Sequence, residues 1–317
     1  MNILFIILLI ITLIFLLILL ASYICFYMAF YVPEKTKRSK EQYSIPEGKI
    51  YEPFREQMIE WQKQIRQMPH ENVSIKSFDG LTLRGKYYEL SPDAPIELMM
   101  HGYRGNSERD LCGGVTRAFA LKHNVLLIDQ RASGESEGNI ISFGINESKD
   151  ALSWLEFLNN RFGNKTKIIL TGVSMGASTV MMAIERGLPE NVVGILADCG
   201  YSSTKEIIKT VIKKMKLPPN ICYPFVKLGG YIFGKFDLEE IVPMEAVHKS
   251  NVPILFAHGD NDDFVPYYMS VQCYNACTSK KALVTIKGAG HGLCYPVAPD
   301  EYVKQLSDFF SYVHKTN

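Results

Sequence analysis

Six short apolar runs recur through the C-terminal two thirds of the chain, and they constrain its fold more than any other feature. They read PIELMMHG, NVLLIDQR, KIILTGVS, VVGILADCG, VPILFAHG and ALVTIKGAG. Helix-like stretches separate most of these runs, over residues 109–120, 147–161, 175–186, 267–277 and 300–313. Apolar strands that alternate with amphipathic helices predict an α/β fold, in which a mostly parallel sheet carries helices on both faces. Ligands bind such sheets beyond the carboxyl ends of the strands, so the polar residues directly after each run are the candidates for a site.

Two further elements precede this alternation. The segment PFREQMIEWQKQIRQMP has apolar residues at helical spacing, which predicts an amphipathic helix that ends before Pro69. The segments NVSIKSF and LTLRGKYYEL, joined through Asp79 and Gly80, predict a β-hairpin.

One connection is much longer than the others, because residues 201–251 separate the fourth apolar run from the fifth. A connection of that length inside a compact domain usually has structure of its own. We expect a helical cap inserted over about residues 201–250, above the strand ends. Within it, EIIKTVIKKMK has one apolar face and lysines elsewhere, which suits either a packed cap helix or a helix on a membrane surface.

The N-terminal segment carries no charged side chain before Glu34, and residues 2–32 are mostly Ile, Leu and Phe. About 20 apolar residues are enough to cross a bilayer. A cleaved signal peptide should have a basic start, a shorter apolar core and an Ala-x-Ala-like site, and this segment has none of them. We therefore expect a transmembrane anchor over residues 1–33. Aromatic residues near its end suggest an interfacial belt, formed by Tyr23, Phe26, Tyr27, Phe30 and Tyr31.

Basic residues follow the anchor directly, at Lys35, Lys37, Arg38 and Lys40. Positive charge beside a membrane span favours the cytoplasmic side, which predicts a single-pass protein of the cell membrane with its C-terminal domain in the cytoplasm. A polar linker over residues 34–52 leads to that domain, residues 53–317, which is long enough for one large core. The seven cysteines show no disulfide framework, and 34 basic against 33 acidic residues leave no basic surface for nucleic acid.

The stretch TGVSMGAS follows the third apolar run and opens a helix-like segment. Its Ser174 lies between Gly172 and Gly176, and small residues at these positions allow a sharp turn that lifts the hydroxyl above the sheet. A glycine-rich structural turn would explain the five residues equally well. A nucleophilic serine also needs a histidine base and an acid that orients the base.

Both partners occur downstream, each directly after an apolar run. AHGDNDDFVP supplies Asp260, Asp262 and Asp263, and KGAGHGLCY supplies His291. The order serine, acid, histidine is that of α/β-hydrolases. The remaining candidate acid is Asp198, which follows the fourth run. Four further histidines have polar or helical surroundings and are expected at the surface, at positions His70, His123, His248 and His314.

An oxyanion site would need two main-chain N–H groups directed at the developing negative charge. One should come from Met175, at the start of the helix after the serine. The other should come from HGYRGN after the first run, where Tyr103 is the best candidate because His101 and Gly102 let the chain turn back over the site. We interpret His101 itself as a residue that braces this loop.

Residues from about 72 to 313 resemble bacterial α/β-hydrolases of the serine aminopeptidase and esterase/lipase-like group. The matching motifs, in order, are HGYRGN, DQRASGESEG, GVSMGAS, HGDNDDFVP and GAGH. The resemblance implies an eight-stranded sheet with one antiparallel strand, a Ser–Asp–His triad and a helical cap. The family pattern His-Gly-x-x-Asp-x-x-Val-Pro maps the acid onto Asp262, with Asp263 and Asp198 as alternatives. DQRASGESEG is expected to be a structural loop in which Asp129 and Arg131 pair.

Together these features predict a membrane-associated serine hydrolase that cleaves carboxylic esters through an acyl-enzyme. Ser174, Asp262 and His291 would form the triad, and the N–H groups of Tyr103 and Met175 the oxyanion hole. The chemistry requires no cofactor or metal, and no His-Glu-x-x-His zinc motif is present. The expected partners are a small ester or acyl compound and the membrane, with the oligomeric state open. A serine peptidase or amidase of the same fold is the first alternative, and a non-catalytic binding module is the second.

Overall fold

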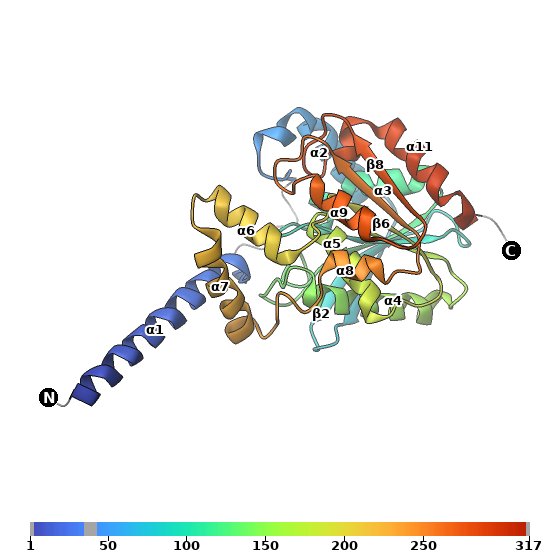
Figure 1. Cartoon of the computed structure of the whole chain (residues 1–317). Helices are drawn as coiled ribbons and strands as arrows, with labels where there is room; N and C mark the ends of the chain where they lie inside the picture. The colour runs from blue at the N-terminus through green and yellow to red at the C-terminus, as the bar shows by residue number, and fades with distance from the viewer. Residues whose placement is uncertain (1–2, 35–42, 315–317) are drawn as a thin grey trace.

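The computed structural model describes residues 3–34 and 43–314, and an eight-stranded sheet runs through its centre (Figure 1). The strand order is β1-β2-β4-β3-β5-β6-β7-β8. Strand β2 pairs antiparallel with both of its neighbours, and all other pairs are parallel. The α/β fold with one antiparallel strand is therefore confirmed. The strands are β1 (Glu71–Lys76), β2 (Thr82–Tyr88), β3 (Ile96–Met100), β4 (Asn124–Asp129), β5 (Ile168–Val173), β6 (Val192–Asp198), β7 (Ile254–Gly259) and β8 (Lys281–Ile286).

Helices cover both faces of this sheet. One face packs against α4 (Ile145–Phe162), α5 (Met175–Ala183), α8 (Pro243–His248) and α9 (Tyr268–Ala276). The other face packs against α2 (Arg55–Gln67), α3 (Ser107–Ala120), α10 (Cys294–Val297) and α11 (Pro299–Phe310). The short 3-10 helices are η2 (Lys49–Phe54), η3 (Ile184–Arg186) and η5 (Ser311–His314).

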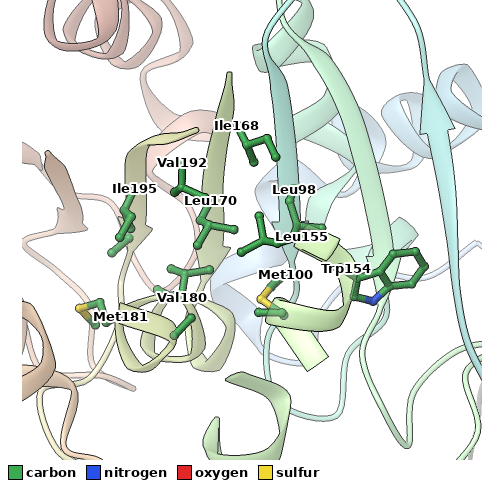
Figure 2. Close-up of a cluster of buried hydrophobic side chains, with 14 of the residues drawn as sticks. Leu98, Met100, Trp154, Leu155, Ile168, Leu170, Val180, Met181, Val192 and Ile195 are labelled. Carbon is green, nitrogen blue, oxygen red and sulfur yellow. The ribbon is translucent and has the colours of Figure 1, made fainter. Parts of the chain in front are cut away.

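The central strands are mostly apolar because both of their faces are buried. Figure 2 shows Leu98 and Met100 of β3 beside Trp154 and Leu155 of α4. Successive side chains of a strand point to opposite faces, and Met99 accordingly belongs to the cluster formed with α2 and α3. This two-sided burial explains why the runs show no polar alternation.

The elements before the alternation form as expected. Strands β1 and β2 make the antiparallel hairpin, and Gly80 in its turn has a φ of 90°, a conformation that favours glycine. Helix α2 ends before Pro69 and buries Met58, Trp61 and Ile65.

The long connection after β6 contains α6 (Thr204–Lys214), α7 (Pro219–Gly229), the π-helical turn η4 (Gly230–Gly234) and α8. The apolar face of α6 is buried through Ile207, Ile208 and Ile212. Helix α6 therefore packs on the domain through this face, in agreement with the expectation of a packed cap helix.

Helix α1 (Ile3–Ala29) projects away from the sheet, and its C-terminal end lies beside α7 (Figure 1). It is long and apolar enough to cross a membrane. The belt interpretation is wrong for Phe26 and Phe30, which are 6% and 0% exposed because they pack against the cap. Tyr23 and Tyr27 stay about half exposed. The basic residues Lys35, Lys37, Arg38 and Lys40 lie outside the described residues, so the orientation of the domain stays a prediction.

Candidate active site

Ser174 sits in a strained turn between β5 and α5. Its φ of 57° and ψ of −120° lie outside the regions that most residues adopt. The flanking glycines make this turn possible, because a Cβ on Gly176 would lie 2.1 Å from the carbonyl oxygen of Met100. A Cβ on Gly172 would lie 2.2 Å from the carbonyl group of Gly176. The segment thus has the geometry of a nucleophile elbow.

Three of the residues singled out in the sequence meet beside this elbow. The distance from Ser174 Oγ to Nε2 of His291 is 2.8 Å, and Nδ1 of His291 lies 2.7 Å from Oδ2 of Asp262. All three residues are less than a tenth exposed. They follow β5, β7 and β8, whose carboxyl ends meet at one edge of the sheet because these strands are parallel. A neutral imidazole that donates to Asp262 can accept the serine proton at Nε2.

Asp262 is surrounded by hydrogen-bond donors. Its Oδ1 accepts from the N–H groups of Phe264 and Val265, at 2.8 and 2.9 Å. Its Oδ2 contacts His291 and also Nε2 of His258, at 3.1 Å. Burial raises the pKa of Asp262, but the hydrogen bonds from His258 and His291 outweigh burial and hold the pKa well below its ordinary value. The carboxyl group is therefore ionised.

The sequence interpretation missed His258. It is fully buried, its Nδ1 lies 2.7 Å from Ser270 Oγ, and its Nε2 also lies 3.0 Å from the carbonyl oxygen of Val265. The available signal was its position inside HGDNDDFVP, at the end of a buried strand, where a polar side chain needs a partner.

The alternative acids do not contact His291. Asp263 is exposed. Asp198 is buried, and its Oδ2 accepts a hydrogen bond of 2.7 Å from the hydroxyl of Tyr302. Asp260 accepts from the N–H of Gly288.

The loop after β3 passes directly beside the serine, since a Cβ on Gly102 would lie 3.8 Å from Ser174 Oγ. The N–H of Gly102 donates to Asp110, at 3.2 Å. Within residues 3–34 and 43–314, the main-chain N–H groups of Tyr103 and Met175 have no acceptor. They are thus free to donate to a bound oxygen. His101 is fully buried and braces this loop, with Nε2 accepting from the N–H of Gln130 at 3.0 Å.

Two sequence expectations near the site need correction. Arg131 does not pair with Asp129, because it binds Asp150 at 2.6 and 2.7 Å and Asp79 at 3.0 Å. Asp129 instead accepts from the main-chain N–H and the hydroxyl of Ser107. His123, expected at the surface, is fully buried, and its Nδ1 lies 2.6 Å from Glu97.

Two cavities meet at Ser174. One, of about 440 Å³, has polar groups in its wall, including Glu47, Tyr51, Arg104 and Asp110. The other, of about 250 Å³, is walled almost entirely by apolar side chains of α1, α6 and neighbouring loops. A substrate that reaches the serine can therefore place a polar part on one side and an apolar part on the other.

The described residues include one group with the spacing of metal ligands, formed by Cys199, Asp262 and His291. Asp262 and His291 bond to each other, and burial raises the pKa of the Cys199 thiol well above its usual value. A protonated thiol is a poor metal ligand. The hydrogen bond between Asp262 and His291 suits proton transfer better than metal binding.

Comparison with known proteins agrees with this geometry. A family model described as the prolyl oligopeptidase family matches residues 229–316. The chain is 26% identical to the uncharacterized protein YqkD of Bacillus subtilis, over 77% of this chain and 80% of that protein. It is 28% identical to protein bem46 of Schizosaccharomyces pombe, over 68% of each. An esterase structure from Pyrococcus furiosus superposes with a TM-score of 0.65 and 18% identity, over 90% of this chain and 98% of the esterase.

One explanation accounts for three findings. They are the eight-stranded sheet with a single antiparallel strand, the elbow at the carboxyl ends of its strands, and these similarities. The chain has the α/β-hydrolase fold.

Proposed function

We propose that this protein is a membrane-associated serine hydrolase that cleaves carboxylic esters through an acyl-enzyme. One observation carries the proposal, namely the unbroken hydrogen-bond chain from Asp262 through His291 to Ser174. The strained elbow and the two unpaired N–H groups beside it support the same reaction.

The first half of the reaction forms the acyl-enzyme. Ser174 Oγ attacks the ester carbonyl carbon while Nε2 of His291 takes the hydroxyl proton. The carbonyl oxygen becomes an oxyanion, which the N–H groups of Tyr103 and Met175 stabilise. The intermediate then expels the alcohol oxygen, which receives the proton from His291. The ionised carboxylate of Asp262 stabilises the transient imidazolium and keeps its ring in place.

The second half repeats these steps with water. His291 removes a proton from a water molecule, whose oxygen attacks the acyl carbon. The tetrahedral intermediate expels Ser174 Oγ, which regains its proton from His291. The products are a carboxylic acid and the free enzyme.

The two cavities support an ester with an apolar acyl group and a more polar alcohol. A serine peptidase is the second candidate, because the acidic residue Glu47 is among those that line the polar cavity. The matching family model, named for an oligopeptidase, points the same way. Hydrolysis rates for nitrophenyl esters and for aminoacyl nitroanilides distinguish the two, because only a peptidase should hydrolyse the less reactive anilides at a substantial rate.

For the membrane association, α1 would be the anchor, with the domain on the cytoplasmic side. The full-length protein should then stay in the membrane fraction after a carbonate wash. Added protease should digest the domain only after cell lysis. Release by the wash would contradict the anchor, and digestion in intact cells would contradict the orientation.

The decisive test of the chemistry is labelling by a fluorophosphonate, which reacts with activated serines. Ser174→Ala should abolish labelling and lower ester hydrolysis by on the order of 10⁶-fold, because the variant has no nucleophile. Ser178→Ala is a matched control in α5, the helix that follows Ser174, since the Ser178 hydroxyl bonds to the main chain of Tyr201 and not to His291. Labelling of the Ser174→Ala variant at the wild-type rate would refute the assignment.

A further inference from the structure

The apolar cavity beside Ser174 has a wall that the anchor helix supplies. Cys25, Met28 and Ala29 of α1 line it on one side. Helix α6 lines it opposite, with Ile208 and Ile212 among its contributors. The cavity therefore lies beside Ser174 with part of its wall supplied by the N-terminal helix and part by the cap.

This part of α1 is built into the domain, in contrast to the residues before it. We call residues 22–29 the inner segment and residues 3–20 the outer segment. Ser22 is fully buried against α7, where a Cβ on Gly229 would lie 2.4 Å from the Ser22 carbonyl oxygen. Glycine at that position lets the two helices approach closely. Most of the large side chains in the outer segment are about half exposed or more.

The inner segment also bonds to the loop that carries the proposed oxyanion donor. The hydroxyl of Tyr103 donates to the carbonyl oxygen of Ala29 at 2.7 Å, and Nη2 of Arg104 donates to that of Met28 at 2.8 Å. These carbonyls belong to the last turn of α1 and have no partner within the helix. A guanidinium group is favourable there because it faces the negative end of the helix dipole.

The chain directly after α1 is anchored as well. The N–H of Val32 donates to the main-chain carbonyl oxygen of Asn139 at 2.8 Å, and the N–H of Ile141 donates to that of Phe30 at 2.9 Å. The end of α1 is thus held on both sides, by the loop after β3 and by the segment before α4.

We propose that the cavity-lining residues of the inner segment, Cys25, Met28 and Ala29, are part of the substrate site and wall the acyl cavity, so that the enzyme selects esters of long apolar acyl chains. The inner segment also holds the Tyr103 loop in position. This inference rests on the proposed serine hydrolase function. Met215 and Leu217 line the same cavity and are 49% and 46% exposed, so an acyl chain can extend past them along the apolar surface of the cap.

The test uses full-length protein and two neighbouring residues of α1. Cys25→Phe places a ring in the cavity, whereas Ile24→Phe adds the same ring at a position that is 48% exposed and outside the cavity. The readout is the ratio of kcat/KM for nitrophenyl dodecanoate to that for nitrophenyl acetate. In Cys25→Phe this ratio should fall by on the order of tenfold or more, because a filled pocket excludes methylene groups. Ile24→Phe should keep the wild-type ratio.

Labelling by the fluorophosphonate separates this inference from the function on which it rests. If the wild-type protein is not labelled, the hydrolase proposal itself fails. If all three proteins are labelled but share one ratio, or if both variants lower it equally, the inner segment does not wall the cavity.

A second arm tests the bracing of the loop. Tyr103→Phe removes only the hydroxyl that bonds to Ala29 and keeps the main-chain N–H. We expect kcat to fall several-fold for acetate and dodecanoate alike, with KM little changed, because a misplaced donor weakens only transition-state binding. An unchanged kcat would show that the bond to α1 does not position this loop.

Discussion

Two buried carboxylate–histidine pairs lie on the same sheet, and only one of them has the setting of a catalytic site. In the first pair, His291 Nδ1 lies 2.7 Å from Asp262, and in the second, His123 Nδ1 lies 2.6 Å from Glu97. The second nitrogen of His291 faces the hydroxyl of Ser174, whereas that of His123 lies 3.1 Å from His314. An acid and a histidine in contact are therefore not enough to identify a site.

The surroundings of the two carboxylates explain the difference. Glu97 also binds Arg117 at 3.0 and 2.6 Å and accepts from the hydroxyl of Thr171 at 2.9 Å, so a permanent cation neutralises it. Among the residues that the structure describes, Asp262 has two main-chain N–H groups and two histidines as its hydrogen-bond partners. In the proposed reaction, His291 would take up a proton beside an acid that has no arginine among its hydrogen-bond partners in the described residues.

Position along the strands separates the pairs further. Glu97 is near the start of β3 and His123 directly precedes β4, while Asp262 and His291 follow β7 and β8. In a parallel sheet, the starts and the ends of the strands lie on opposite sides of the domain. Ligands bind beyond the carboxyl ends of the strands, so only the position of Asp262 and His291 would bring an acid–histidine pair to a substrate.

Asp262→Asn breaks the proposed catalytic pair. It should lower activity more than a substitution in the Glu97–His123 pair does. Replacing the acid of such a triad leaves the geometry intact but favours the wrong histidine tautomer, so we expect kcat to fall by about 10⁴-fold. Ester hydrolysis in the steady state measures this loss. Activity within tenfold of wild type would show that another acid orients His291.

Glu97→Gln should have the opposite profile. It leaves the guanidinium of Arg117 buried without its counter-charge, which should lower the free energy of unfolding by about 3–5 kcal/mol. Because this cluster lies at the opposite ends of the strands from Ser174, kcat for the folded protein should stay at the wild-type value. Urea unfolding of both proteins, followed by circular dichroism, gives the stability difference. A loss of kcat without a loss of stability would reverse the roles assigned to the two pairs.

The pH dependence of that stability difference should have a definite sign. Burial raises the pKa of Glu97, but Arg117 and His123 outweigh burial and lower it to about 2. A depressed pKa stabilises the folded state above the ordinary glutamate pKa of about 4.3, and this stability is lost as the pH falls toward 2. The difference between wild type and Glu97→Gln should therefore be constant above about pH 5 and shrink below it. A difference that grows on acidification would contradict the ionised pair.

Much of the architecture could be predicted from the sequence because it depends on local patterns. The apolar runs that alternate with helices were sufficient to predict the sheet. The Asp79-Gly80 pair was sufficient to predict the hairpin turn. The candidate catalytic residues were chosen by their order and by their positions after strands, and the structure brings Ser174, Asp262 and His291 into contact. Their roles stay a prediction until activity is measured.

Contacts between distant segments could not be predicted in this way. Arg131 has Asp129 as a sequence neighbour but binds Asp79 and Asp150, because folding brings the hairpin turn and α4 to its guanidinium. His123 has polar neighbours in the sequence, yet the C-terminal helix and β3 bury it.

The sequence by itself determined that this chain forms an α/β-hydrolase sheet, that a long apolar helix precedes it, and which residues are the best candidates for its chemistry. Only the tertiary structure decided that the end of this helix lines a cavity at Ser174 and that His258 supports Asp262. The physical reason is that periodicity and turn residues act over a few neighbours, whereas a cavity wall needs groups such as Tyr103 and Ala29, 74 positions apart, to meet in space.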